Sequence, residues 1–265
     1  MPHDHRDLAT EGLASPVPSL SLVIPAYNEG RRIVQTLHRV EAFFAAQPYV
    51  VEVLIVDDGS TDDTAAAARA FVGPGRPLQV LTIPHGGKAA ALRVGLAAAR
   101  NDLIGFSDAD LATPLSYLDQ LRDAITGGCD VAIGSREGIG ARRVGEPLHR
   151  HIMGRVFNAV IRLLLLPDVQ DTQCGFKLFR RDAIQAILAR ARLYATAGET
   201  VRGPRVTAFD VELLVIARRL GYRIAAVPVV WTYGERSKVQ PVRDTWHNAR
   251  DVVRVRINAW RGRYG

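Results

Sequence analysis

The chain has 265 residues, 48% of them hydrophobic, which suits one large domain, and its two cysteines exclude a disulfide framework or a cysteine-rich zinc site. The formal net charge of +7 is uneven: residues 1–137 carry 11 Lys and Arg against 17 Asp and Glu, and residues 138–265 carry 23 against 10. No apolar run approaches the roughly 20 residues that a spanning helix needs, and the polar segment 1–18 lacks the apolar core of a signal peptide. We therefore expect a cytoplasmic protein with a disordered tail over 1–18. The acidic half suits binding of a metal ion, and the basic half suits binding of phosphate groups. The alternative for the basic half is an Arg-rich surface that is merely solvated.

Short apolar runs alternate with helical periodicity through the first half of the chain. They predict strands over 19–26, 51–60, 78–83, 103–110 and 130–136, and helices over 30–47, 87–101 and 114–126. This order indicates an α/β fold whose central sheet is mostly parallel and flanked by helices. Ligands of such sheets bind beyond the carboxyl ends of the strands. Neither a Gly-x-Gly-x-x-Gly motif nor a P-loop is present, which argues against a dinucleotide oxidoreductase and a P-loop NTPase.

Three polar clusters follow predicted strands and therefore meet at one edge of the sheet. They are PAYNE (25–29), DDGSTD (57–62) and DAD (108–110). Asp108 and Asp110 repel each other unless a cation lies beside them, and carboxylate oxygens suit Mg²⁺ or Mn²⁺. Such a pair can clamp a nucleoside diphosphate through the ion. The alternative is a solvated strand end with two helix-capping acids.

The set PAYNE, VDDGSTD and DAD, in this order, resembles glycosyltransferase family 2, and the resemblance runs from about residue 20 to the C-terminus. The segments DVQDTQCGFKLFRRDA (168–183), AFDVELLVIARRLGYRIAAVPVVW (208–231) and WTYGERSKVQPVRD (231–244) resemble the dolichyl-phosphate β-glucosyltransferase branch. The related mannosyltransferases match less well from QDTQCGFK onward.

The resemblance implies a GT-A fold, as a single Rossmann-like domain over 19–240. It implies metal-dependent, inverting transfer of glucose from the nucleotide sugar UDP-glucose to a polyprenyl (dolichyl-type) phosphate. A GDP-mannose donor and a soluble acceptor stay open as alternatives. A basic binding module without catalysis is a further alternative, although the acidic clusters would repel nucleic acid, which we do not expect as a partner.

The same resemblance assigns roles to residues. The nucleotide-sugar pocket is expected to comprise Pro25, Ala26, Tyr27, Asn28, Glu29, Asp57, Asp58, Lys88, Arg93, Asp108, Ala109 and Asp110. The metal ligands are expected to be Asp108 and Asp110, which are also the expected catalytic residues together with Asp210, for which a helix-capping role is the alternative. Ala112 stands where many related mannosyltransferases have a metal-binding Gln, so water would replace that ligand.

The acceptor phosphate is expected to meet Ser135, Arg136 and Arg150, since arginine presents a planar fork of donors to phosphate oxygens. Gln173 and Lys238 are expected near the sugar. The Gly-rich basic stretch 137–146 is expected to be a mobile loop over the site.

The C-terminal segment 241–265 is predicted to be a basic amphipathic helix. One face carries Trp246, Val253, Ile257, Trp260 and Tyr264, and another carries Arg250, Arg254 and Arg261. With a second apolar helix over 156–166, this pattern favours peripheral attachment to the inner face of a membrane, either directly or through a membrane-protein partner. The alternative is that both helices pack on the domain itself.

Overall fold

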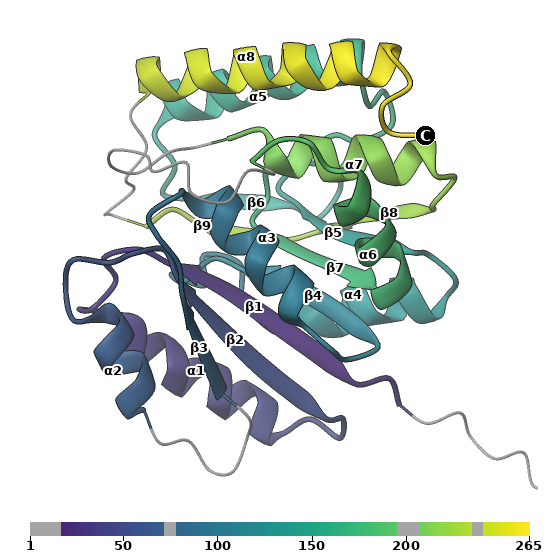
Figure 1. Cartoon of the computed structure of the whole chain (residues 1–265). Coiled ribbons are helices and arrows are strands. Elements are labelled where there is room, and N and C mark those ends of the chain that lie inside the picture. The colour runs from purple at the N-terminus through teal and green to yellow at the C-terminus, as the bar shows by residue number, and fades with distance from the viewer. Residues whose placement is uncertain (1–16, 72–77, 195–206, 235–240) are drawn as a thin grey trace, which may run out of the picture.

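The structure is a computed structural model, which describes the chain except for residues 1–16, 72–77, 195–206 and 235–240, and only the backbone of residues 241–246. Within the described residues, a sheet of seven strands forms the centre of the molecule (Figure 1). Its order is β3-β2-β1-β4-β7-β5-β8, and β7 runs antiparallel to both neighbours whereas the other pairs are parallel. The strands are β1 (Leu20–Ala26), β2 (Val51–Asp57), β3 (Leu78–Thr82), β4 (Leu103–Ser107), β5 (Val131–Ser135), β7 (Phe176–Arg180) and β8 (Ile224–Pro228).

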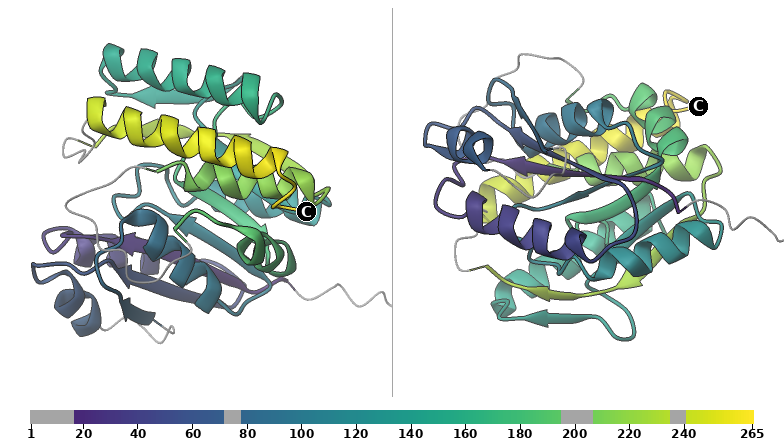
Figure 2. Two further views of the ribbon diagram at one scale, coloured as in Figure 1. Left: turned by 45° about the horizontal axis from the view of Figure 1, so that its top comes forward. Right: turned by 90° about the horizontal axis from the view of Figure 1, so that it is seen from below.

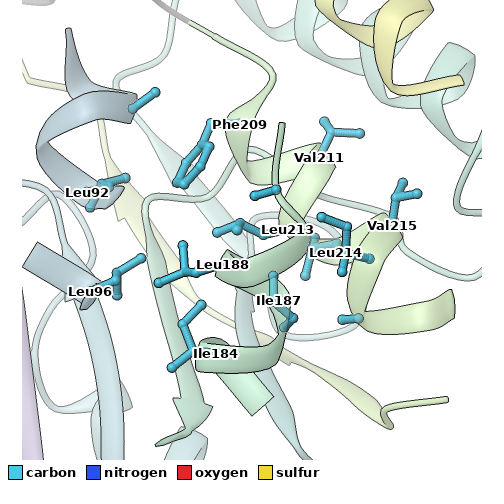
Figure 3. Packing of buried hydrophobic residues seen from close by; sticks show 14 of the residues in the cluster. Leu92, Leu96, Ile184, Ile187, Leu188, Phe209, Val211, Leu213, Leu214 and Val215 are labelled. Carbon is cyan, nitrogen blue, oxygen red and sulfur yellow. The ribbon is translucent and has the colours of Figure 1, made fainter. Parts of the chain in front are cut away.

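Helices cover both faces of this sheet, because its central strands are apolar on both sides. In β1, Leu22 and Ile24 face one core and Val23 faces the other. The first core lies against α1 (Ile33–Ala45) and α4 (Tyr117–Thr126), with the short α2 (Thr64–Ala70) beside α1 and β3. The second core lies against α3 (Lys88–Ala98), α6 (Arg181–Arg190) and α7 (Phe209–Arg219), as Figure 3 shows.

Helix α3 lies close to the sheet at Gly95. A Cβ atom at Gly95 would come within 2.3 Å of Val23 and 2.8 Å of Val56, so only glycine allows this approach. The close packing brings the N-terminus of α3, with Lys88, to the carboxyl ends of β1 and β4.

Two long helices, α5 (Leu148–Leu164) and α8 (Pro241–Trp260), lie side by side above α7 (Figures 1 and 2). Beneath them, β6 (Arg142–Val144) and β9 (Val230–Thr232) form a small parallel sheet. The side chains of Val252, Val255 and Ala259 are buried in the core that α7 shares. The expected C-terminal segment 241–265 is therefore packed into the domain, and the expected tail over 1–18 lies almost wholly outside the described residues.

The prediction of a mostly parallel α/β sheet is confirmed, with two local corrections. The fourth strand ends at Ser107 instead of continuing to residue 110, so that Asp108 and Asp110 lie in a turn. The strand β7, which the sequence patterns did not predict, enters the sheet between β4 and β5. Among the described residues, no helix combines the length and apolar character needed to cross a membrane.

Candidate active site

A cavity of about 840 Å³ lies beyond the carboxyl ends of β1, β2 and β4 and extends between α5 and α8. Its inner end is polar, and its lining there includes Tyr27, Glu29, Asp58, His85, Lys88, Asp108, Asp110, Arg136, Arg150, Gln173 and Asp210. Its outer part, which we call the apolar corridor, is lined by Ile152, Met153, Val156, Phe157, Val160 and Leu164 of α5 and by Ala249, Val252 and Val253 of α8. The polar end and the apolar corridor are therefore parts of one continuous cavity.

The turn after β4 presents both carboxylates to this cavity. The backbone N–H of Leu111, which has a φ of 50°, donates to the carbonyl of Asp108, and the N–H of Ala112 donates to Oδ1 of Asp110 at 3.0 Å. Burial raises the pKa of Asp110, and the neighbouring Asp108 raises it further. The Asp108 carboxylate lies against Gly175, where a Cβ atom would approach Oδ2 to 2.0 Å. Glycine at 175 therefore makes room for this carboxylate.

Lys88, the first residue of α3, bonds Oδ1 of Asp108 through its Nζ atom. Burial opposes the charged amine, yet the carboxylates of Asp108 and Asp210 raise the pKa of Lys88 above its ordinary value. The two carboxylates and the amine thus form a cluster with both signs of charge, suited to a phosphate and a cation bound together.

The carboxylates of Asp108 and Asp110 are suitable ligands for a magnesium or manganese ion, because both metals prefer oxygen ligands. They do not complete a site alone, because the described part of the chain holds no group of three or more His, Cys, Asp or Glu side chains able to bind a metal ion. Ala112 offers no side-chain ligand. Oxygen atoms of a substrate phosphate and of water would have to fill the remaining positions.

An aromatic pair, which we call the aromatic wall, also lines the cavity. The rings of Tyr27 and His85 are stacked with centroids 4.0 Å apart. Asp58 holds His85 in place, because its Oδ2 lies 2.8 Å from the imidazole Nδ1, and it also accepts the N–H groups of Gly86 and Gly87 at 2.8 Å. Burial raises the pKa of Asp58 above its ordinary value, against these hydrogen bonds. His85 was missed by the sequence analysis, although it follows β3 at the same edge of the sheet.

The expected nucleotide-sugar residues divide into two groups. Pro25, Ala26, Tyr27, Glu29, Asp58, Lys88, Asp108, Ala109 and Asp110 line the cavity. Asn28 and Asp57 do not; Asn28 accepts hydrogen bonds from Thr61, and Asp57 accepts the N–H of Ser60, so both shape the surrounding loops.

Arg93 lies away from the cavity, unlike Lys88, the other charged residue of α3 that is predicted for the nucleotide-sugar pocket. Its guanidinium donates to the carbonyls of Ala191 and Leu188 at 3.2 and 3.3 Å, which ties α3 to the end of α6. It does not line the cavity, because it projects from a different side of α3 than Lys88 does.

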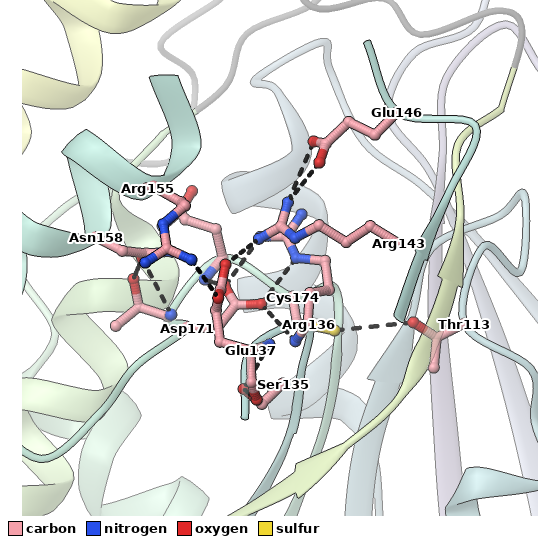
Figure 4. A network of polar contacts seen from close by, with 12 residues as sticks. Thr113, Ser135, Arg136, Glu137, Arg143, Glu146, Arg155, Asn158, Asp171 and Cys174 are labelled. Atoms are coloured by element: carbon pink, nitrogen blue, oxygen red, sulfur yellow. Dashed lines mark hydrogen bonds and ion pairs between the residues drawn. The ribbon is translucent and has the colours of Figure 1, made fainter. Parts of the chain in front are cut away.

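The expected acceptor residues meet different partners, and Figure 4 shows the network around two of them, Ser135 and Arg136. Arg136 lines the cavity, but its guanidinium donates to both oxygens of Asp171 at 2.8 and 2.9 Å. Although burial would raise it, Arg136 holds the pKa of Asp171 well below its usual range. Ser135 is buried and donates to the carbonyl of Glu137, away from the cavity, so its expected phosphate contact is not available here.

Arg150, on the first turn of α5, lies where the polar end of the cavity meets the apolar corridor. Its Nη1 donates to the hydroxyl of Tyr233 at 2.7 Å, and its guanidinium lies 5.2 Å from the centre of that ring. Arg150 is therefore the better positioned of the two predicted arginines for a phosphate.

Asp210, at the start of α7, forms a buried ion pair with Lys177 of β7 at 2.7 Å, and Lys177 also donates to the carbonyl of Cys174. Gln173 lines the cavity, and its buried amide nitrogen has no hydrogen-bond partner among the described residues. The expected site residue Lys238 lies outside the described residues.

The stretch 137–146, which is expected to be a mobile loop, contains a short strand and several ion pairs. The strand is β6, and Arg143, whose side chain is largely shielded from solvent, bonds both Glu137 and Glu146 at 3.0 and 2.9 Å (Figure 4). Its basic residues thus hold the segment together.

The predicted apolar stripe of α8 is partly wrong. Val253, Ile257 and Trp260 are exposed, as a membrane-facing stripe requires, but Tyr264 is fully buried. Its hydroxyl donates to Glu212 of α7 at 2.8 Å. The side chain of Trp246 lies outside the described residues.

Comparisons with known proteins agree with this architecture. The model of the family "Glycosyl transferase family 2" matches residues 21–188. Glycosyltransferase AglD of Haloferax volcanii is 33% identical over 242 residues, which are 89% of this chain but only 36% of AglD. The dolichyl-phosphate β-glucosyltransferase of Drosophila melanogaster is 32% identical over 266 residues, covering 93% of this chain and 78% of the fly protein.

Among solved structures, glucosyl-3-phosphoglycerate synthase from Mycobacterium tuberculosis, in complex with Mn²⁺, UDP-glucose and phosphoglyceric acid, superposes with a TM-score of 0.61. The match has 18% sequence identity and covers 94% of this chain and 80% of the synthase. At this identity the likeness concerns the fold.

Proposed function

Since the chain belongs to glycosyltransferase family 2 and has the GT-A fold, we propose that it transfers glucose from UDP-glucose to a polyprenyl phosphate, with Mg²⁺ or Mn²⁺. The relatives named as dolichyl-phosphate β-glucosyltransferases support the donor sugar and the acceptor class.

One observation carries the choice of a lipid acceptor. The cavity joins the carboxylates of Asp108 and Asp110 to the apolar corridor between α5 and α8. A small soluble acceptor needs only the polar end, whereas a prenyl chain needs an apolar path that starts at its phosphate. Arg150, at the junction, would bind that phosphate.

At the polar end, the donor would lie between the carboxylates and the aromatic wall. Tyr27 would stack on the base, Glu29 would accept hydrogen bonds from the ribose, and Lys88 would contact the diphosphate. A cation held by Asp108 and Asp110 would neutralise charge on the departing diphosphate.

The acceptor phosphate can attack without a strong general base. The second pKa of a phosphate monoester is about 6, so the acceptor is largely dianionic at neutral pH. One of its oxygens forms a bond to the anomeric carbon while the bond from that carbon to the diphosphate breaks, and UDP leaves with the electron pair. Attack from the side opposite the leaving group inverts the centre. Asp210, fixed by Lys177, would orient the sugar or the acceptor.

The exposed faces of α5 and α8 support peripheral attachment to the cytoplasmic face of a membrane. Leu163 is 84% exposed and Trp260 is 81% exposed. Arg254 and Arg256 are exposed on the same helix as Trp260, so anionic headgroups would add to the attraction.

The test is sugar transfer with purified protein, comparing UDP-glucose with GDP-mannose and polyprenyl phosphate with 3-phosphoglycerate. We expect glucosyl-lipid that requires Mg²⁺ or Mn²⁺ and disappears in Asp110→Ala, while Asp123→Ala, an exposed change on α4, leaves it intact. Mannosyl-lipid would overturn the donor assignment. Transfer only to 3-phosphoglycerate would overturn the lipid acceptor.

A further inference from the structure

Lys88 already forms an ion pair with one of the two carboxylates that would bind a divalent metal ion. Its Nζ atom bonds Oδ1 of Asp108, and each side chain is 37% exposed, at the wall of the cavity. Asp108 is confined on its other side by the backbone at Gly175. An incoming cation therefore meets a carboxylate that is already neutralised.

The rest of the site offers the cation little compensation. One carboxylate oxygen of Asp110 already accepts a hydrogen bond from the N–H of Ala112. The side chain of Ala112 offers no metal ligand. The amine of Lys88 and a divalent ion thus compete for Asp108 until a bound ligand supplies further oxygen atoms.

The donor's diphosphate is the group that can resolve this competition. Lys88 begins α3, and Gly87, Lys88 and Ala89 all line the cavity, so a phosphate bound there would meet backbone N–H groups and the positive end of a helix of 11 residues. The lysine stem is flexible and its ammonium is a point charge without fixed directionality, so it can turn from a carboxylate to a phosphate.

We propose that Lys88 is a built-in counter-ion, which leaves Asp108 for the donor's diphosphate when donor and cation bind together. The proposal rests on the proposed nucleotide-sugar and metal chemistry of this site. It follows that the cation binds weakly to the protein alone and that the nucleotide strengthens its binding, by freeing Asp108 as well as by supplying ligands. By linkage, the cation must strengthen nucleotide binding by the same factor.

The experiment measures Mn²⁺ binding by electron paramagnetic resonance, with and without UDP, in wild-type protein, Lys88→Met and Lys88→Arg. We expect Lys88→Met to bind Mn²⁺ alone about tenfold more tightly than wild type, and UDP to strengthen Mn²⁺ binding by a smaller factor than in wild type. UDP without metal should bind Lys88→Met more weakly than wild type. Lys88→Arg keeps a cation beside Asp108, so Mn²⁺ alone should bind it as weakly as wild type.

Arg32→Met is the matched control. Arg32 lines the same cavity near Asp110, but its guanidinium bonds Glu29 at 2.7 Å and not Asp108. An equal gain of Mn²⁺ affinity in Arg32→Met would show that the loss of any positive charge in the cavity strengthens Mn²⁺ binding. That result would overturn the proposal. Unchanged or weaker Mn²⁺ binding in Lys88→Met would overturn it as well, while a normal complex of wild type with Mn²⁺ and UDP would leave the proposed function standing. Failure of wild type to bind UDP with Mn²⁺ would overturn both.

Discussion

Arg136 and Asp171 form a buried two-pronged ion pair, with Nε and Nη2 of the arginine 2.8 and 2.9 Å from the two carboxylate oxygens. The backbone N–H of Arg136 donates to the same carboxylate at 2.9 Å. The sequence resemblance predicts that Arg136 binds the acceptor phosphate. The pair joins the end of β5 to the loop before β7, and so fixes Arg136 at the lining of the cavity.

Asp171→Asn should therefore act mainly on stability. Loss of one partner leaves a buried guanidinium without its counter-charge, and we expect a loss of about 3 to 5 kcal/mol in the free energy of unfolding. Urea unfolding measures this loss. The exposed change Asp182→Asn serves as control. Unaltered stability together with a raised KM for the acceptor would show that Arg136 serves the phosphate after all.

The apolar corridor can be blocked at Gly154. This residue lines the cavity on α5, and a Cβ atom there would meet no other atom within 4 Å. Gly154→Phe should fold, because a Cβ atom fits there and glycine is a poor helix former. Its ring should fill part of the corridor and so lower kcat/KM for long-chain polyprenyl phosphate by at least about tenfold. Gly154→Ala is the matched control. A loss of UDP affinity in Gly154→Phe would contradict a corridor that serves only the acceptor.

The C-terminal turn is anchored by the bond between Tyr264 and Glu212 at 2.8 Å. Tyr264→Phe removes the donor and should lower the free energy of unfolding by about 1 to 2 kcal/mol. Tyr222→Phe, on a partly buried tyrosine of the same core, should have a smaller effect. Equal stability of the two variants in urea would refute an anchoring role for the hydroxyl.

Glu212 should make stability depend on pH. Burial raises its pKa above the ordinary value of 4.5, so its contribution to stability is complete below pH 4.5 and is lost as the pH rises through the raised pKa. Glu212→Gln cannot ionise, so its free energy of unfolding relative to wild type should increase between pH 4.5 and pH 8. Urea unfolding across that range gives the comparison, and a constant difference would argue against a raised pKa.

The exposed faces of α5 and α8 should carry membrane binding. The double variant Leu163→Asp/Trp260→Asp should bind vesicles that contain anionic lipid at least about tenfold more weakly, because each apolar side chain contributes to partitioning. Val50 is also exposed, at 69%, but lies in the loop before β2, so Val50→Asp is the control. Sedimentation with vesicles measures the difference. Equal binding of all three proteins would place any membrane contact elsewhere.

The α/β class and the edge of the sheet that bears the site follow from the amino-acid sequence alone. Apolar runs that alternate with helical periodicity imply parallel strands, and parallel strands bring their carboxyl ends together. The clusters around Tyr27, Asp58 and Asp108 could be assigned to one cavity on that basis, without any knowledge of side-chain contacts.

The contacts of each side chain, in contrast, depend on how the elements pack against one another. Helical periodicity marks the apolar positions of α8, but only its neighbours determine that Val255 and Tyr264 are buried while Trp260 is exposed. The antiparallel entry of β7, the pairing of Arg136 with Asp171 and the position of Arg93 depend on contacts between segments far apart in the chain. Local sequence patterns do not contain these contacts, because the same arginine can meet a carboxylate, a carbonyl or a phosphate according to the element packed against it.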